Sequence, residues 1–309
     1  MSWTDLLSAA AQSLAVIAAA PLVNGVARAT KASLQRRRGP GLLQHYRDLA
    51  KLFRKDAVFS RDASWISRVG PFVVFGATAA LTWLVPSILK TAPLGFGGDL
   101  FAILYLLALA RFFLALQGLD AGSAFGGEGS SREMALASIF EPPLALVLIV
   151  LALGTGSTQI AGISSVMESG QGHALSAAQP FLLCAFFMLV VAETGRVPVD
   201  NPDTHLELTM VHEGMLLEAS GPYLALLTWA SMIKQVVLFS LVVDLFFPWA
   251  GGPPVLAAAG WLVKMVFLAI VLGFAETLTA KMRLFKLLDY STISMGLAFL
   301  GLFFLVVGA

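Results

Sequence analysis

Eight long apolar runs decide what this chain of 309 residues can fold into. The hydrocarbon core of a bilayer is about 30 Å thick, and a helix needs about 20 residues to cross it. Inside that core every backbone N–H and C=O must be satisfied within the protein, so each run is predicted to be a helix. The sequence therefore predicts an all-α integral membrane protein, a bundle of about eight transmembrane helices. The predicted spans are 6–27, 71–89, 100–116, 135–153, 179–192, 223–247, 255–274 and 292–308.

The composition agrees with a membrane protein. Hydrophobic residues make up 58% of the chain and charged residues 13%, whereas soluble domains carry about 25% charged residues. No polar stretch is long enough to fold alone, so residues 1–309 are predicted to form a single membrane domain. The short span 179–192 is expected to extend at its start or to be sheltered by neighbouring helices. The lipid bilayer is the expected surrounding; no nucleic acid is expected as a partner, and no GxxxxGK[ST] or GxGxxG motif occurs.

Lysine and arginine residues set the predicted orientation. The loop 28–70 holds 11 of the 20 basic residues, and the loops after the third, fifth and seventh spans hold further ones. Basic loops face the cytoplasm, so both termini are predicted to lie outside a bacterial or archaeal cytoplasmic membrane. No basic residue precedes the first span, which therefore is expected to be a retained helix rather than a signal peptide.

An amphipathic cytoplasmic helix is predicted within 41–55. Apolar residues recur at helical spacing from Leu42 to Phe53, and basic residues occupy the other side. The basic side is expected either to meet anionic lipid head groups or to dock a peripheral partner. The residues expected to have structural or docking roles are Arg37, Arg38, Arg47, Arg132, Arg196 and Arg283.

An acidic loop at 193–222 gathers polar residues between two apolar runs. Six carboxylates, one arginine and two histidines fall between Glu193 and Ser220. A charged group in hydrocarbon costs about 2.5–3.5 kcal/mol on insertion scales, so the acidic loop cannot face lipid. We expect it to line a protein-enclosed, hydrated cavity near the membrane surface. Pro198 and Pro202 keep its first part out of regular helix, and a helix is predicted from Thr204.

Ionisable residues within the spans are further candidates. Lys234 and Lys264 lie deep in their predicted helices and must face protein or water, either as proton relays or as structural ion pairs. Glu141 either holds water beside proline-freed backbone groups or lies on the surface, if its helix begins only after it. Arg111 precedes the glycine-rich stretch 118–133. The glycines of this stretch predict a tight, irregular loop close to other backbone, and the charges suit a polar cavity.

Carboxylates and imidazoles in one enclosed pocket favour proton transfer, because coupled acids share protons. The predicted proton path comprises Glu141, Glu193, Asp200, Asp203, His205, Glu207, His212, Glu213, Glu218, Lys234 and Lys264. A metal site is the lesser alternative, since HExxH spacing is absent. The single cysteine, Cys184, excludes an internal disulfide framework, an iron–sulfur cluster or a four-cysteine zinc site in this chain.

The acidic loop resembles a known sequence pattern. From Glu193 to Leu208 it reads E-x-x-R-x-P-x-D-x-P-D-x-x-x-E-L, and from Glu218 to Pro222 it reads E-x-S-G-P. This pattern resembles the loop between helices five and six of the complex I subunit 1 family. The sequence RRGPG at 37–41 resembles the first cytoplasmic loop of that family.

The departures from that pattern point to one branch of the family. His205 stands where quinone-reducing members usually have a glutamate, and Val199 where they usually have a phenylalanine. These features are more similar to the membrane subunits of formate hydrogenlyase-type, membrane-bound nickel–iron hydrogenases. The resemblance implies a non-redox subunit that anchors peripheral hydrogenase-type and iron–sulfur subunits. It also implies a carboxylate path that couples electron transfer to proton or sodium ion movement in antiporter-like membrane subunits.

The same resemblance implies where the cofactors lie. Iron–sulfur clusters and the nickel–iron site are expected in the partner subunits, and this chain is expected to hold no cofactor. Two alternatives stay open. One is the quinone-binding membrane subunit of an NADH-quinone oxidoreductase, and the other is a free-standing secondary transporter, for which inverted repeats would be expected. No internal repeat is apparent in the sequence.

Overall fold

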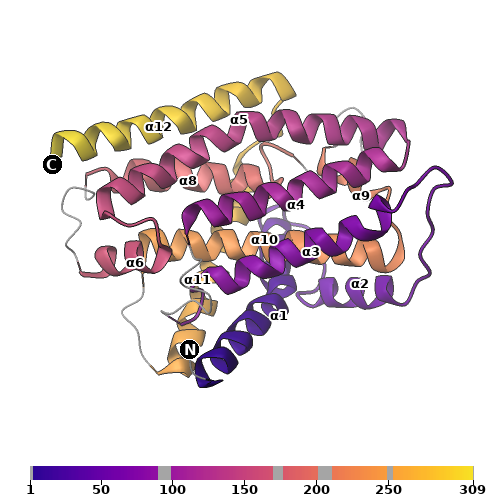
Figure 1. Ribbon diagram of the computed structural model, residues 1–309, viewed down its shortest axis with the longest axis horizontal. Coiled ribbons are helices and arrows are strands. Elements are labelled where there is room, and N and C mark those ends of the chain that lie inside the picture. The colour runs from indigo at the N-terminus through magenta and orange to yellow at the C-terminus, as the bar shows by residue number, and fades with distance from the viewer. Residues whose placement is uncertain (1–2, 90–98, 170–176, 201–210, 249–252, 309) are drawn as a thin grey trace.

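The computed structural model describes residues 3–89, 99–169, 177–200, 211–248 and 253–308 (Figure 1), and within these ranges it is a helical bundle without named strands. The predicted all-α fold class is therefore confirmed. The helices are α1 (Trp3–Leu34), α2 (Gln44–Phe53), α3 (Ile66–Leu84), α4 (Leu100–Asp120), α5 (Ala124–Thr155), α6 (Ile160–Ser169), α8 (Gln179–Glu193), α9 (His212–Leu216), α10 (Gly221–Phe246), α11 (Pro254–Leu278), the 3-10 helix η2 (Leu284–Lys286) and α12 (Leu287–Gly308).

Seven of the described helices, α1, α3, α4, α5, α10, α11 and α12, are long and apolar enough to cross a membrane. The eighth predicted span corresponds to α8, which has only 15 residues. Its neighbours α5, α10 and α12 pack against it. Leu182, Ala185 and Leu189 of α8 are fully buried, so the short helix is sheltered by protein, as its sequence predicts.

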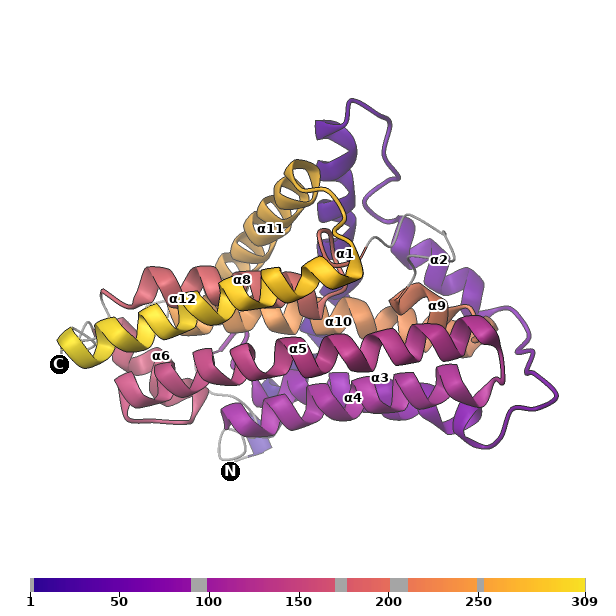
Figure 2. The ribbon, with the colours of Figure 1, turned by 90° about the horizontal axis from the view of Figure 1, so that it is seen from above.

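Helix α10 lies at the centre of the bundle and is the most buried of the spanning helices. It packs against α1, α2, α3, α6, α8 and α11. Helices α4, α5 and α12 run side by side, whereas α1 and α11 lean away from them at a steep angle (Figure 2). The helices α2 and α9 lie at one end of the bundle, and α6 and the C-terminus lie at the other (Figure 1).

Prolines inside two spanning helices free backbone carbonyls that other helices then satisfy. A proline at position i removes the hydrogen bond to the carbonyl at i−4, which frees the oxygen of Ile17 below Pro21 and that of Ile139 below Pro143. The indole Nε1 of Trp229 in α10 donates to the Ile17 oxygen at 3.1 Å. The hydroxyl of Ser291 in α12 donates to the Ile139 oxygen at 2.8 Å. Each freed carbonyl thus becomes a contact between helices.

Helix α5 runs unbroken from Ala124 through both prolines to Thr155. Glu141 therefore lies inside the helix, and the alternative that it stands at a helix end is wrong. The predicted irregular loop at 118–133 is also wrong, because only residues 121–123 separate α4 from α5. Glycines here allow two helices to approach, which is a common use of small residues in membrane proteins. A Cβ on Gly126 would overlap the carbonyl oxygen of Gly118.

The predicted amphipathic helix at 41–55 is confirmed as α2. Leu49 is buried and Tyr46 is half-buried, and the Tyr46 hydroxyl donates to the backbone oxygen of Ala18 in α1. The Phe53 ring meets the Trp229 ring edge-on at 6.3 Å. Arg47 is exposed. Helix α2 therefore lies along α1 and α10 and presents its basic residues to solvent.

Two neighbouring glycines give a matched test of this helix packing. We expect Gly126→Ala to destabilise the protein by about 1–3 kcal/mol, because the added methyl group collides with α4 backbone. Gly127→Ala should be neutral or stabilising by up to about 1 kcal/mol, because its Cβ would meet open space and alanine favours helix. Melting temperatures of the purified variants, followed by tryptophan fluorescence in detergent, measure both. Equal melting temperatures for the two variants would contradict the close approach of α4 and α5.

Candidate functional site

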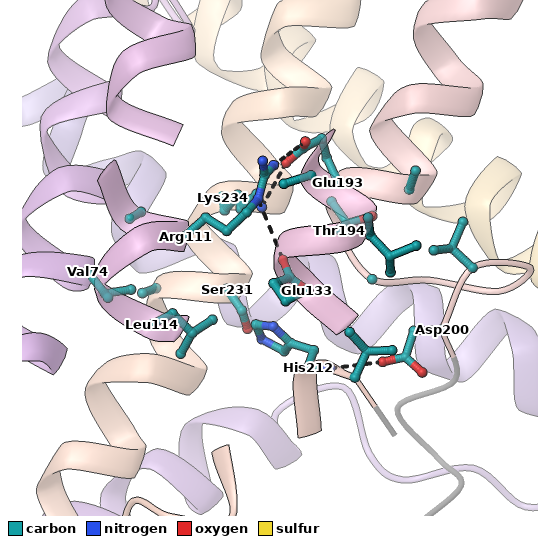
Figure 3. A pocket seen from close by; sticks show the side chains of 18 of the residues that line it. Val74, Arg111, Leu114, Glu133, Glu193, Thr194, Asp200, His212, Ser231 and Lys234 are labelled. Atoms are coloured by element: carbon teal, nitrogen blue, oxygen red, sulfur yellow. Dashed lines mark hydrogen bonds and ion pairs between the residues drawn. The ribbon is translucent and has the colours of Figure 1, made fainter. Parts of the chain in front are cut away.

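Arg111 is the centre of a buried ion cluster, which we define as Arg111, Glu133, Glu141, Glu193 and Lys234. Arg111 lies in the middle of α4, and its side chain is 6% exposed. Its guanidinium contacts Glu141 of α5. It also contacts Glu193 at the end of α8, and its Nε lies 3.6 Å from Glu133 Oε1 (Figure 3). One arginine thus joins three helices through ion pairs.

Lys234 completes the ion cluster from α10. Its Nζ lies 2.9 Å from Glu193 Oε2, and the Glu193 side chain is only 2% exposed. The predicted lysine–carboxylate pair therefore exists. The cluster holds three carboxylates and two cations, so it has one carboxylate more than its cations balance. Such a surplus acid suits a group that gains and loses protons.

A small cavity of about 60 Å³ connects the ion cluster with the acidic loop. Glu133, Glu193 and Lys234 line one part of it, and Asp200 and His212 line another (Figure 3). One water molecule needs about 10–15 Å³ of such space, so the cavity has room for a few. Among the ionisable residues of the acidic loop that the structure describes, Glu193, Asp200 and His212 line this cavity, whereas Glu213 and Glu218 do not.

Arg196 holds the first part of the acidic loop against three spanning helices. Its guanidinium donates to Asn24 Oδ1 of α1 at 2.5 Å and to Gln235 Oε1 of α10 at 2.7 Å. It also lies 3.4 Å from Glu276 Oε1 of α11, whose Oε2 is 3.2 Å from Lys31 Nζ. The sequence predicts a structural or a docking role for Arg196, and these bonds favour the structural role.

Asp200 is anchored from a different side. Lys281 Nζ lies 2.7 Å from its Oδ1, and the backbone N–H of His212 donates to its Oδ2 at 3.2 Å. Asp200 and His212 also line a second cavity of about 270 Å³, which α1, α2 and α10 border together with the loop. These two residues are therefore shared by the small cavity and the large one.

The structure brings some of the predicted proton-path residues together and separates others. Glu141, Glu193 and Lys234 lie in the ion cluster, and Asp200 and His212 lie on the cavity next to it. Three residues lie elsewhere. Glu213 lines only the larger cavity, Glu218 bonds to Ser123, and Lys264 lies on a separate cavity beside α6. Asp203, His205 and Glu207 lie outside the described residues, as does the predicted helix from Thr204 as far as residue 210.

Most of the predicted docking residues are accessible. Arg37, Arg38, Arg47 and Arg283 are exposed. Arg132 instead pairs with Glu128 one helical turn away on α5. Among the described residues, no group of three or more histidine, cysteine or acidic side chains is placed to hold a metal ion.

Sequence reasoning missed the role of Arg111 and Glu133. The predicted loop covers 118–133, whereas Arg111 falls inside the apolar run 100–116, and neither Arg111 nor Glu133 is among the predicted proton-path residues. An arginine at that depth must find partners within the protein, and this rule alone marks it as functional. Glu133 has no such signal, because it lies in the stretch that is predicted to be irregular.

His45 of α2 borders the larger cavity and is buried. Its pKa is lowered from 6.5 to about 4, first by burial and then by the positive charges of Arg28 and Arg196, while Asp48 acts in the opposite direction. His45 is therefore a neutral side chain at neutral pH.

Comparison with known proteins finds a matching family and close relatives. The NADH dehydrogenase family profile matches residues 8–307. Hydrogenase-4 component C of Escherichia coli strain K12 is 36% identical, over 98% of this chain and 96% of that protein. Formate hydrogenlyase subunit 4 of the same organism is 37% identical, over 88% of this chain and 90% of that protein.

A solved structure shares the fold. A chain of the membrane-bound sulfane sulfur reductase, an archaeal respiratory membrane complex, matches with a TM-score of 0.85 and 19% identity. The match covers 99% of this chain and 100% of the other. At this level of identity the likeness concerns the helical arrangement.

Removing Arg111 should destabilise the bundle through the carboxylates it leaves behind. We expect Arg111→Met to lower the stability by about 3–5 kcal/mol, because buried charges lose their partner. Adding Glu193→Gln should cost less than the sum of the two single changes, since the residues are coupled. Arg132→Met, which breaks the pair with the exposed carboxylate of Glu128, should cost clearly less stability than Arg111→Met, because a solvent-exposed carboxylate is not left buried without its partner. Melting temperatures and membrane yields test the set, and strictly additive effects would contradict the ion cluster.

His45 should make stability depend on pH. Its pKa is lower in the folded protein, so between pH 6.5 and about 4 the unfolded chain binds more protons. Stability from His45 is then fully present above pH 6.5 and is lost as the pH falls toward about 4. Nuclear magnetic resonance of labelled histidines, assigned with His45→Gln, should give a midpoint near pH 4. A midpoint at or above 6.5 would contradict the burial of His45.

Proposed function

Because the chain belongs to the NADH dehydrogenase family, that of complex I subunit 1, we propose that it is the membrane subunit of a complex I-related, membrane-bound hydrogenase. The names of its relatives, hydrogenase-4 component C and formate hydrogenlyase subunit 4, support a complex of this type. The subunit itself carries no redox centre in this proposal. Iron–sulfur clusters and the nickel–iron site belong to its peripheral partners.

The end of the bundle with α2 and the acidic loop is the docking face in this proposal. It faces the cytoplasm, and both termini face the outside of the bacterial or archaeal cytoplasmic membrane. The exposed Arg37, Arg38, Arg47 and Arg283 lie on loops or on α2 at this end, where they suit contacts with hydrogenase-type and iron–sulfur subunits. Electron transfer in those subunits then changes the charge next to the acidic loop.

The ion path starts at the acidic loop and ends at the flank of the bundle. Asp203, His205, Glu207, Glu213 and Glu218 supply further proton carriers at its entrance in this proposal. Asp200 and His212 line the small cavity together with Glu193, and in this proposal water in that cavity links them. Arg111 binds Glu193 and Glu141 at once. A proton that arrives at Glu193 weakens its hold on Arg111, so the arginine shifts toward Glu141. The guanidinium then stabilises the Glu141 carboxylate, so Glu141 releases its own proton, and no proton passes through Arg111.

Glu141 marks the exit of the path. Its side chain is 47% exposed, although Arg111, its partner, lies in the middle of a spanning helix. A carboxylate at that depth cannot face lipid tails, so a neighbouring protein must cover it. An antiporter-like membrane subunit that takes the proton, or exchanges it for a sodium ion, fits this position. The bridge from Glu193 through Arg111 to Glu141 is the observation that carries the proposal.

A quinone-binding membrane subunit of an NADH-quinone oxidoreductase is the second candidate. The 270 Å³ cavity supports it, because α1, α2 and α10 enclose a space that Arg28, His45 and Arg196 line beside Leu49. A cavity of about 150 Å³ already admits a benzene ring. Inhibition of the purified complex by a quinone-site inhibitor favours this candidate, and insensitivity favours the hydrogenase. Mass spectrometry of the co-purifying subunits separates the two directly.

Neutralising Glu141, the last acid of the proposed path, should uncouple proton movement from hydrogen evolution. We expect Glu141→Gln to keep assembly and hydrogen evolution near wild-type levels and to abolish proton movement, because the path loses its last acid. Glu128→Gln is the matched control, since Glu128 lies on the same helix, is similarly exposed and pairs with Arg132 instead of Arg111. Fluorescence quenching in inverted vesicles, with and without sodium, measures the ion movement beside hydrogen evolution. Full coupling in Glu141→Gln would refute the proposed path.

A further inference from the structure

A separate cavity of about 270 Å³ lies at the end of the bundle away from the acidic loop. It is enclosed by the residues that follow α3, by α6, by the end of α10 and by the first part of α11 (Figure 1). It shares no lining residue with the two cavities of the candidate site. Nothing in the proposed ion path uses it, although it contains ionisable groups.

Asp244 of α10 is the buried acid in this cavity. The residue is 8% exposed, and its Oδ2 has no hydrogen-bond partner among the described residues. The other buried acids differ, since Glu193, Asp200 and Glu276 each have a lysine nitrogen within 3.2 Å. A buried carboxylate oxygen without a partner is costly. Water in the cavity that Asp244 lines removes that cost.

The rest of the lining is suited to hold water. Lys264 of α11 donates to the backbone oxygen of Phe247 at 2.7 Å, and its charge also interacts with that of Asp244. Glu168 and two serines of α6 add further polar groups. An ordered water needs two to four polar partners, and this lining offers them. The ammonium group of Lys264 is thus a cation near Asp244 that balances its charge. The hydrogen bond to Phe247 fixes this ammonium group at the end of α10.

Asp244 and the ion cluster share one helix. Lys234 and Asp244 are ten residues apart on α10, which is a rise of about 15 Å. Between them Gln235 and Ser240 are the polar side chains in an otherwise apolar segment. The Ser240 hydroxyl accepts a hydrogen bond from Trp261 Nε1 at 3.1 Å, and Trp261 lines the cavity.

We propose that this cavity is a water-filled vestibule open to the outer side of the membrane, in which Asp244 exchanges protons with external water. In each exchange the protonated carboxyl gives its proton to a water molecule, which leaves the carboxylate and a hydronium ion, or the reverse occurs. Lys264 is a positioning residue that steadies the carboxylate. The inference rests on the proposed function, because it adds an outer access site to the same ion-moving subunit.

Thiol labelling tests the access independently of ion movement. Asp244→Cys and Leu245→Cys are made in a Cys184→Ala background, since Cys184 is exposed. Leu245 lies at the same depth, is 0% exposed and does not line the cavity. A membrane-impermeant methanethiosulfonate reagent is added to right-side-out or inverted vesicles that hold the whole complex. We expect the Asp244→Cys thiol to react from the outer side and the Leu245→Cys thiol to stay unmodified.

Coupling measurements give the second readout. Asp244→Asn should lose proton movement and retain hydrogen evolution, and Asp244→Glu should keep both. Equal labelling of the two thiols, labelling only from the inner side, or wild-type proton movement in Asp244→Asn would overturn the inference. If the wild-type complex moves no ions, the proposed function fails instead, and labelling still reports on the vestibule.

Discussion

Pairing of charges inside an apolar bundle is the constraint on which the rest of this structure depends. Arg111 would be very costly in hydrocarbon alone, so its presence in α4 requires acids from other helices. Glu133, Glu141 and Glu193 meet that requirement from α5 and α8, and Lys234 balances them from α10. The mutual need for partners fixes the relative positions of four helices. The charges that hold the bundle together are also the ones that the proposed ion path uses.

Hydrogen bonds between helices follow the same principle for neutral groups. Pro21 and Pro143 each free one backbone carbonyl within a spanning helix, and side chains of α10 and α12 reach those oxygens. The bundle thus places donors where its own backbone lacks them. Arg196 makes the same kind of contact from the acidic loop, because its guanidinium donates hydrogen bonds to the side-chain oxygens of Asn24 and Gln235. Irregular backbone at this depth is tolerated because protein, and not lipid, surrounds it.

The fold could be predicted from the sequence more fully than the candidate site. Apolar run lengths predict the spanning helices, and spacing predicts α2, because both are local patterns. The pair of Lys234 with a carboxylate also follows from a local rule, that a deep lysine needs a partner. The ion cluster around Arg111 does not follow from a local rule, because no local pattern shows which helices become neighbours.

One of the errors has a specific physical cause. The glycines of 118–133 suggest a loop in the sequence, whereas in a membrane such residues let α4 and α5 touch. The surroundings of Lys264 depend on helix packing, which the sequence does not give. Helix α11 packs along α1 and leans away from α4, α5 and α12 (Figure 2), and Lys264 bonds to the backbone oxygen of Phe247 at the end of α10.

The exposed side chain of Glu141 has a further consequence. Left uncovered in a bilayer, it would draw water into the hydrocarbon and weaken the permeability barrier of the cell. In the proposed complex, the subunit that covers Glu141 therefore has to join this chain during assembly.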